Sequence, residues 1–176
     1  CSQVMGLFLD IHTDKYKDSR EVVWDMAVAM NKELLALRDA GCRCIQIEEP
    51  TLHFMANTYG ARDEKVKFMV DCYNREVQGL DDCEIWIHTC WGNPNMQRVM
   101  EDTSYKASFE LYLHEMRGDV WTIETKDRNF TDIELFALTS NDFVSTARPP
   151  ISRAIIPLFT ALVLRFITDA VAATRS

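Results

Sequence analysis

The sequence lacks a Cys-x-x-Cys motif and any regular cysteine framework. Its six cysteines stand at positions 1, 42, 44, 72, 83 and 90, and no stretch before them reads as a secretory signal. These absences argue against a disulfide-stabilised secreted domain and favour free thiols in a reducing compartment. We therefore expect a cytoplasmic protein in which the cysteines at 42, 44, 72 and 83 are buried as small apolar residues.

Positive charge is also scarce. Nineteen lysines and arginines stand against 27 aspartates and glutamates, which gives a formal net charge of −8. A chain this acidic is expected to have neither nucleic acid nor an anionic membrane surface as its main partner. Its composition is otherwise that of a globular protein, with 47% hydrophobic and 26% charged residues.

One long apolar stretch is present, from Ile151 to Ala173. A membrane-spanning helix needs about 20 apolar residues with few charges. Arg153, Arg165 and Asp169 interrupt this stretch, and Pro157 lies inside it. The pattern therefore argues against a membrane span and favours an amphipathic or exposed helix.

Strand-like and helix-like segments alternate along the rest of the chain. Apolar residues at helical spacing follow the candidate N-caps Ser19 and Asp63, and a loop containing Asn57 and Gly60 precedes the second helix. A polar helical region is expected at 95–117. Short apolar runs predict strands at 4–9, 42–47, 84–88 and 119–123.

This order, with crossovers long enough for parallel pairing, predicts a β/α architecture. A closed barrel needs about 200 residues or more, whereas this chain has 176 and begins at Cys1 in place of Met. The predicted fold is therefore a partial TIM-type β/α barrel with parallel strands in residues 1–136. A divergent tail, 137–176, is expected to carry the apolar helix.

The segment from Ile85 to Pro94 contains the strongest candidate site. A strand is expected to end at His88 and Cys90, before Gly92. Residues two apart in an extended chain point to the same side, so the imidazole and the thiol are expected together. Both groups are preferred zinc donors, although a hydrogen-bonded structural pair is the alternative interpretation.

Two other predicted strands also end in side chains that can carry chemistry. Glu48 and Glu49 follow one strand, and Glu124 ends another. Parallel β/α units place functional groups beyond the carboxyl ends of their strands. We therefore predict that the donors of His88, Cys90 and Glu124 converge on one zinc ion, with one coordination position left for a substrate.

Three ordered segments resemble the catalytic domain of the cobalamin-independent methionine synthase family. They are the segments 45–50 (IQIEEP), 88–90 (HTC) and 119–124 (DVWTIE), and the resemblance covers about residues 6–136. It implies a β/α barrel that binds Zn²⁺ and transfers a methyl group from a methyltetrahydrofolate to the sulfur of homocysteine. A small thiol and a methyl donor are thus the expected partners, in methionine biosynthesis.

The resemblance also implies roles for individual residues. His88, Cys90 and Glu124 take the zinc-ligand positions, and Glu48 stands where the family usually has an Asp that holds the substrate amino group. Two further candidates come from position in the sequence and not from the resemblance. Trp91, directly after Cys90, either covers the substrate pocket or packs in the core. Asp127, just past Glu124, either binds substrate or pairs with Arg128, its neighbour in sequence.

The chain departs from the family pattern at three points. Glu48 is one methylene longer than Asp, 33 residues separate Cys90 from Glu124, and no cysteine follows Glu124 as a further ligand. The long spacing resembles the epoxyalkane:coenzyme M transferase branch. The alternatives to a methionine synthase-like enzyme are thus a thiol alkyltransferase of that branch or an inactive truncated fragment. A metal-free barrel like uroporphyrinogen decarboxylase is a third, against which the His-x-Cys pair argues.

Overall fold

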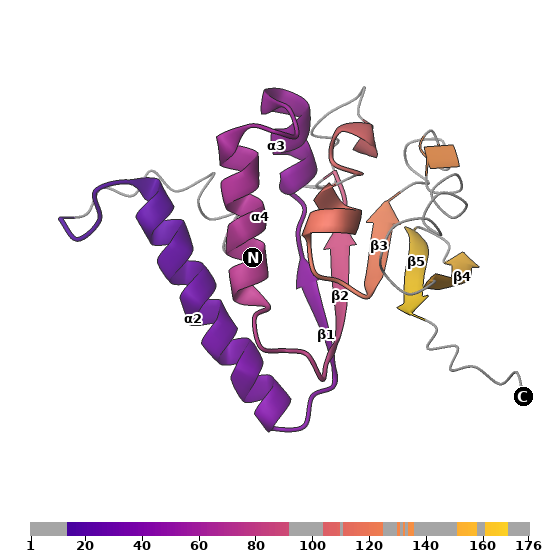
Figure 1. Ribbon diagram of the computed structural model, residues 1–176, viewed down its shortest axis with the longest axis horizontal. Helices are drawn as coiled ribbons and strands as arrows, with labels where there is room; N and C mark the ends of the chain where they lie inside the picture. Colours follow the sequence, from indigo (N-terminus) through magenta and orange to yellow (C-terminus); the bar gives the residue numbers. More distant parts are fainter. Residues whose placement is uncertain are drawn as a thin grey trace, which may run out of the picture.

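A five-stranded sheet in the order β1-β2-β3-β5-β4 forms the centre of the molecule (Figure 1). The computed structural model describes residues 14–91, 104–109, 111, 114–124, 130, 132 and 134–135, and the backbone alone of 112–113, 151–157 and 161–168. β1 (Cys44–Glu48), β2 (Glu84–Thr89) and β3 (Val120–Glu124) run parallel. Three predicted parallel strands are thus confirmed, and the one at 4–9 lies outside the described residues.

The tail forms strands where the sequence predicted a helix. β4 (Ile151–Pro157) pairs antiparallel with β5 (Ala161–Thr168), and β5 pairs antiparallel with β3. The helix predicted over 151–173 is therefore wrong at both strands. Pro157 lacks the N–H of a helical hydrogen bond. The stretch is also rich in β-branched residues, which favour strands, at 151, 155, 156, 163, 167 and 168.

The sheet is open in the part of the chain that the structure describes, with β1 at one edge and β4 at the other. Its parallel half agrees with the predicted β/α architecture. Closure into a barrel is not seen among these residues, and the reversal of direction at β5 departs from an all-parallel arrangement. The division of the chain between residues 136 and 137 stays a prediction.

Two helices predicted from apolar periodicity lie on one side of the parallel strands (Figure 1). α2 (Ser19–Asp39) begins one residue earlier than expected, because Asp18 rather than Ser19 is its cap, with a carboxylate that accepts from the Glu21 N–H. α4 (Glu64–Glu76) has the predicted cap, Asp63, which accepts from the N–H of Lys65.

The expected loop before α4 contains a further helix, α3 (Leu52–Tyr59). The loop prediction was wrong because Leu52, Met55 and Ala56 form a short apolar stripe at helical spacing, and all three are buried. In the region predicted as a polar helix, the described residues form a 3₁₀ turn (Tyr105–Ala107) and a π-helical turn (Leu111–Glu115). None of the described helices combines the length and apolarity that a membrane crossing requires.

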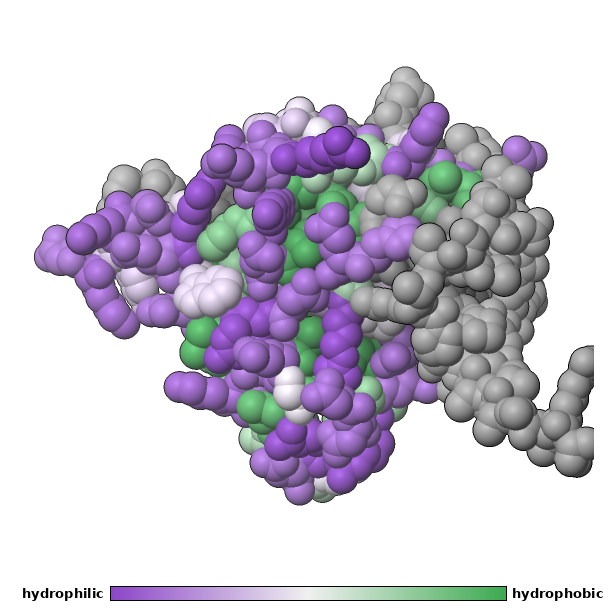
Figure 2. Space-filling view, in the orientation of Figure 1, coloured by the Kyte–Doolittle hydropathy of each residue, from purple (hydrophilic) through white to green (hydrophobic). Residues whose placement is uncertain are grey.

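The two faces of the parallel strands differ in burial. Ile45, Ile47, Ile85 and Ile87 face the helices and are buried in the core, whereas alternate residues of β1 on the other face are exposed. Figure 2 shows mostly hydrophilic side chains over the helices, with hydrophobic ones visible between them. Of the cysteines expected in the core, those at 72 and 83 are buried, the one at 42 is half-buried and the one at 44, on edge strand β1, is exposed.

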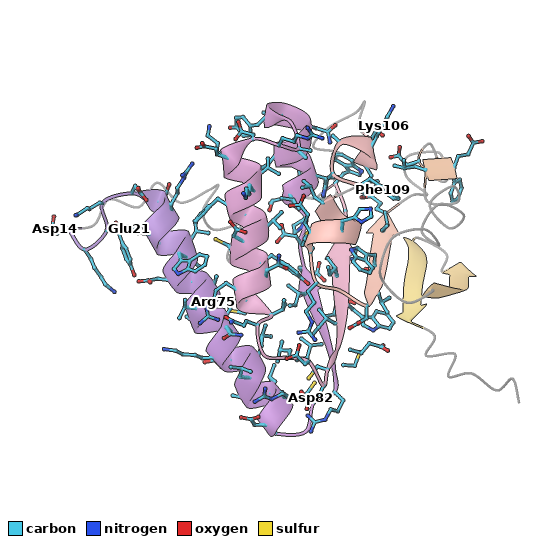
Figure 3. All side chains as sticks on the ribbon, in the orientation of Figure 1. Asp14, Glu21, Arg75, Asp82, Lys106 and Phe109 are labelled. Carbon is cyan, nitrogen blue, oxygen red and sulfur yellow. The ribbon has the colours of Figure 1, made fainter. Side chains whose placement is uncertain are left out.

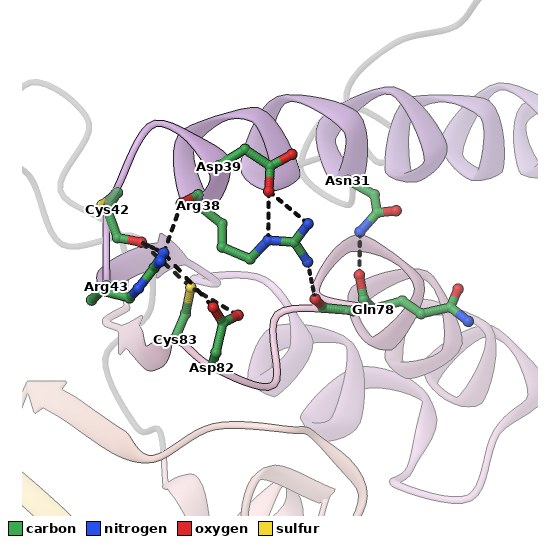
Figure 4. A network of polar contacts seen from close by, with 9 residues as sticks. Asn31, Arg38, Asp39, Cys42, Arg43, Gln78, Asp82 and Cys83 are labelled. Atoms are coloured by element: carbon green, nitrogen blue, oxygen red, sulfur yellow. Dashed lines mark hydrogen bonds and ion pairs between the residues drawn. The ribbon is translucent and has the colours of Figure 1, made fainter.

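Polar side chains attach α2 to the C-terminal end of α4 and the segment that follows it. The buried Asn31 amide donates to the carbonyls of Glu76 and Gln78, at 2.9 and 2.8 Å. Arg75, which lies between α2 and α4 in Figure 3, donates to the Asn31 side-chain oxygen at 2.7 Å. Further along α2, Arg38 donates a 2.6 Å hydrogen bond to the carbonyl of Gly79 (Figure 4). These contacts fix the helical layer that supports the strands.

Candidate functional site

The carboxyl ends of the three parallel strands bring Glu48, His88 and Thr122 into one row. Glu48 is in register with His88, and His88 with Thr122. The Nδ1 atom of His88 and the Thr122 hydroxyl share a hydrogen bond of 2.8 Å. The Nε2 atom of His88 lies 3.7 Å from a carboxylate oxygen of Glu48. Glu48 is exposed, His88 is half-buried and Thr122 is buried, so the row is accessible from its Glu48 end.

Cys90 and Glu124 lie close to this row, at the carboxyl ends of β2 and β3. Each directly follows a member of the Thr89–Ile123 register pair on β2 and β3. Cys90 is a half-buried thiol outside any disulfide. The Glu124 carboxylate accepts a 2.9 Å hydrogen bond from the backbone N–H of Trp91. The predicted site residues on β2 and β3 thus do lie at neighbouring strand ends.

The donor types at this edge fit zinc, which favours imidazole, thiolate and carboxylate ligands. Because Nδ1 of His88 is occupied by Thr122, Nε2 is the nitrogen available to a metal, and such an outer hydrogen bond is usual for a metal-binding histidine. The predicted convergence of three donors is nevertheless not seen. Among the described residues no three His, Cys, Asp or Glu side chains form a group that could hold an ion.

The other two predicted substrate residues have different outcomes. Trp91 is fully buried, with its ring packed among those of His53, Phe54 and Tyr105 at centroid distances of 4.3, 5.3 and 5.0 Å. This is the core-packing alternative, and contact between Trp91 and a substrate stays a prediction. Asp127 lies outside the described residues.

Sequence reasoning missed the burial of Glu49. Its carboxyl is 1% exposed, and one oxygen accepts a 2.8 Å hydrogen bond from the Thr51 hydroxyl. Burial raises the pKa of Glu49 from 4.5 to about 7, the Thr51 hydrogen bond opposes the rise and the nearby Glu76 carboxylate adds to it. Apolar and polar residues alternate in the sequence of β1, and successive side chains of a strand point to opposite faces. This signal could have placed Glu49 on the buried face, opposite to the exposed face that carries Glu48.

His53 is the second residue that sequence reasoning missed. The structure buries it completely on α3. Its Nδ1 atom and the Thr89 hydroxyl share a 2.9 Å hydrogen bond. Thr89 separates His88 from Cys90, so His53 contacts the candidate site from the helix side of the sheet. No spacing in the sequence signals this contact, since 36 residues separate the two positions.

Comparisons with known proteins agree with the resemblance. The family model for the catalytic domain of cobalamin-independent synthase matches residues 11–145. The methionine synthase of Sulfolobus acidocaldarius is 27% identical over 125 residues, which cover 71% of this chain and 31% of the relative. That of Saccharolobus islandicus is 31% identical over 124 residues, covering 70% and 31%.

A solved structure, the B12-independent methionine synthase of Shewanella in complex with selenomethionine, is 30% identical. The match covers 45% of this chain and 21% of that one, with a TM-score of 0.34. The chain spans about a third of the length of the curated relatives it matches.

Proposed function

This chain belongs to the cobalamin-independent methionine synthase family, and on that premise we propose that it is part of a zinc-dependent methyltransferase. The proposed reaction moves a methyl group from a methyltetrahydrofolate-type donor to the sulfur of a small thiol such as homocysteine. The observation that carries the proposal is the placement of Glu48, His88 and Glu124 at the carboxyl ends of three neighbouring parallel strands. Active sites of β/α proteins lie at this edge.

His88, Cys90 and Glu124 are the residues that would hold zinc, because they supply three donor types at adjacent strand ends. Bound zinc lowers the pKa of a thiol, so that the substrate sulfur is present as a nucleophilic thiolate. Thr122 holds the imidazole of His88 through Nδ1, which leaves Nε2 directed to the open side of the sheet near Glu48.

Glu48 is the residue proposed to orient the substrate. Its exposed carboxylate lies beside His88, where it would attract the ammonium group of an amino-acid thiol. Charge attraction of this kind holds the substrate so that its sulfur is directed toward the donor side chains. Proximity and orientation are major sources of rate enhancement in group transfer.

Zinc content and methyl transfer test this proposal with a matched pair of cysteine variants. We expect zinc to bind the purified chain and to be lost in Cys90→Ser, whereas Cys44→Ser, at the opposite end of edge strand β1, retains it. Methionine formation from homocysteine should show the same difference. A metal-free wild-type protein would contradict the zinc proposal, and zinc without methyl transfer would identify an inactive fragment.

The thiol alkyltransferase alternative is not favoured, because the relatives reported above are methionine synthases. Coenzyme M offered in place of homocysteine distinguishes the two substrates directly. Faster alkylation of coenzyme M than of homocysteine would reverse this assignment.

A further inference from the structure

The buried residue His53 contacts the segment that carries His88 and Cys90 from the helix side of the sheet. This histidine is the second residue of α3, the helix that follows β1, and it is completely buried. The Thr89 hydroxyl that bonds to its Nδ1 atom is also buried, on the helix side of β2. Because successive residues of a strand face opposite sides, Thr89 anchors the backbone between His88 and Cys90 without occupying the open face.

The ring of His53 makes a second contact with the same segment. It lies against Trp91 with ring centroids 4.3 Å apart and planes at 80°, an edge-to-face arrangement. Trp91 is enclosed further by Phe54 and Tyr105. His53 therefore contacts the residues on both sides of Cys90, one by a hydrogen bond and one by ring packing.

Trp91 also contacts Glu124, the last residue of β3. Its backbone N–H donates to a carboxylate oxygen of Glu124 at 2.9 Å, so the position of the Trp91 backbone determines where that carboxylate is held. A continuous series of direct contacts thus runs from α3 through Thr89 and Trp91 to Glu124. It links the two strand ends that carry the candidate metal donors.

From these contacts we propose that His53 is a positioning residue, which orients Cys90 through its two neighbours and Glu124 through Trp91. Its assignment to metal binding rests on the function proposed above. Histidine suits this place because its ring both packs against an indole and hydrogen-bonds to a buried hydroxyl. Phenylalanine would keep the ring and lose the hydrogen bond, whereas glutamine would keep a polar group and lose the ring.

The first test follows the backbone amide of Trp91 by NMR hydrogen exchange in the metal-free protein. We expect His53→Phe and Thr89→Val to accelerate its exchange by about tenfold or more, while the amide of Val70 in α4 reports global unfolding. Thr89→Ser keeps the hydroxyl and should stay close to wild type. His114→Phe, an exposed histidine, is the matched control. Unchanged Trp91 exchange in both His53→Phe and Thr89→Val would overturn the proposal.

The second test measures the affinity and visible spectrum of Co²⁺ as a zinc substitute. Loss of a hydrogen bond made directly to a metal ligand typically lowers affinity about 10- to 100-fold, and the Thr89 bond, which lies between two proposed ligands, should give a loss at the lower end, about 10-fold. We expect this loss in His53→Phe and in Thr89→Val, with the double variant no worse than either single one. Wild-type affinity in both would overturn the metal-positioning role. If wild-type protein binds no Co²⁺, the proposed function fails, and amide exchange alone decides whether His53 positions Glu124.

A variant that simply unfolds is recognised by its Val70 amide. In that case Thr89→Val, which removes one hydroxyl with little change in shape, decides the result. Equal acceleration at Trp91 and Val70 in Thr89→Val would show general destabilisation and would contradict a positioning role.

Discussion

The imidazole of His88 and the hydroxyl of Thr122 share a 2.8 Å hydrogen bond between two neighbouring parallel strands. Thr122 is a buried residue of β3 whose hydroxyl contacts the nitrogen on the far side of the ring from Glu48. The bond therefore restricts rotation of the imidazole and selects Nε2 as the nitrogen that faces the open side.

Replacing Thr122 with Val should weaken zinc binding by about 10- to 100-fold, because Val keeps the shape and removes the hydroxyl that orients His88. Competition with a chromophoric chelator measures this change. Thr122→Ser retains a hydroxyl and is expected to bind zinc nearly as wild type does. Equal zinc affinities for the Val and wild-type proteins would show that His88 is oriented by other contacts.

Folding stability should fall as pH rises because of Glu49. Its folded-state pKa is raised from 4.5 to about 7, so the folded protein binds this proton more tightly than the unfolded chain does. The resulting stability is fully present below the unfolded pKa and is lost as pH rises to about 7, by at most about 3 kcal/mol. Urea unfolding near pH 5 and pH 8 measures the loss.

Glu49→Gln is the diagnostic variant for this dependence. An amide stays neutral, so the variant should be more stable than wild type at about pH 8 and show a flatter profile between the two pKa values. Glu33→Gln, at an exposed position of α2, should leave the wild-type profile unchanged. A Glu49→Gln profile as steep as that of wild type would assign the pH dependence to other groups, such as the buried Glu76, whose charge also raises the Glu49 pKa.

Gly118 is expected to tolerate no side chain. A Cβ atom at this position would lie 2.5 Å from Cδ1 and 2.9 Å from Cγ1 of Ile87, in the core behind β2. Gly118→Ala should therefore lower the free energy of unfolding by about 1–3 kcal/mol, as overpacking does. Thermal or urea unfolding provides the measurement.

The matched second change is Ile87→Val, which removes the nearest of these atoms. Alone it should lower stability by about 1 kcal/mol. Combined with Gly118→Ala it should lower stability by less than the sum of the single effects, because the closer of the two contacts has been removed. Additive losses would place the effect of Gly118 in its backbone rather than in this contact.

Asn31→Ala should loosen α2 from the segment after α4. The substitution removes two hydrogen bonds to the carbonyls of Glu76 and Gln78 and the acceptor for Arg75. A buried polar group that loses its partner typically lowers stability by about 1–3 kcal/mol. Lys32→Ala, at the adjacent exposed position, is the control in the same urea titration. A loss no larger than in that control would show that water replaces these bonds.

The sequence predicted the strands better than the connections between them. The apolar runs that became β1, β2 and β3 end in polar residues, and this pattern places strand ends reliably. α3 was missed because the helix is only eight residues long and contains the polar residues His53 and Asn57 beside its apolar stripe. The helix predicted in the tail was wrong because the long apolar stretch divides at Pro157 into two short runs, and a short apolar run fits a buried strand as well as a helix.

The candidate site was predictable only in part. The strand-end positions of His88, Cys90 and Glu124 follow from sequence order, since each ends or follows a predicted strand. The contacts behind them do not, because His53 reaches Thr89 across 36 residues through packing that no periodicity records. The same holds for Trp91, whose burial depends on three rings from α3 and the 3₁₀ turn.

The reversal of direction between β3 and β5 also decides which part of the tail borders the site. Ala161, the first residue of β5, stands in register with Glu124, and Pro157, the last residue of β4, pairs with Leu162, so the neighbouring ends of β4 and β5 lie at this edge. A fourth parallel strand would have brought another carboxyl end there instead. Inserting residues between Pro157 and Ala161 should therefore alter steric access to Glu124 while leaving the three parallel strands intact.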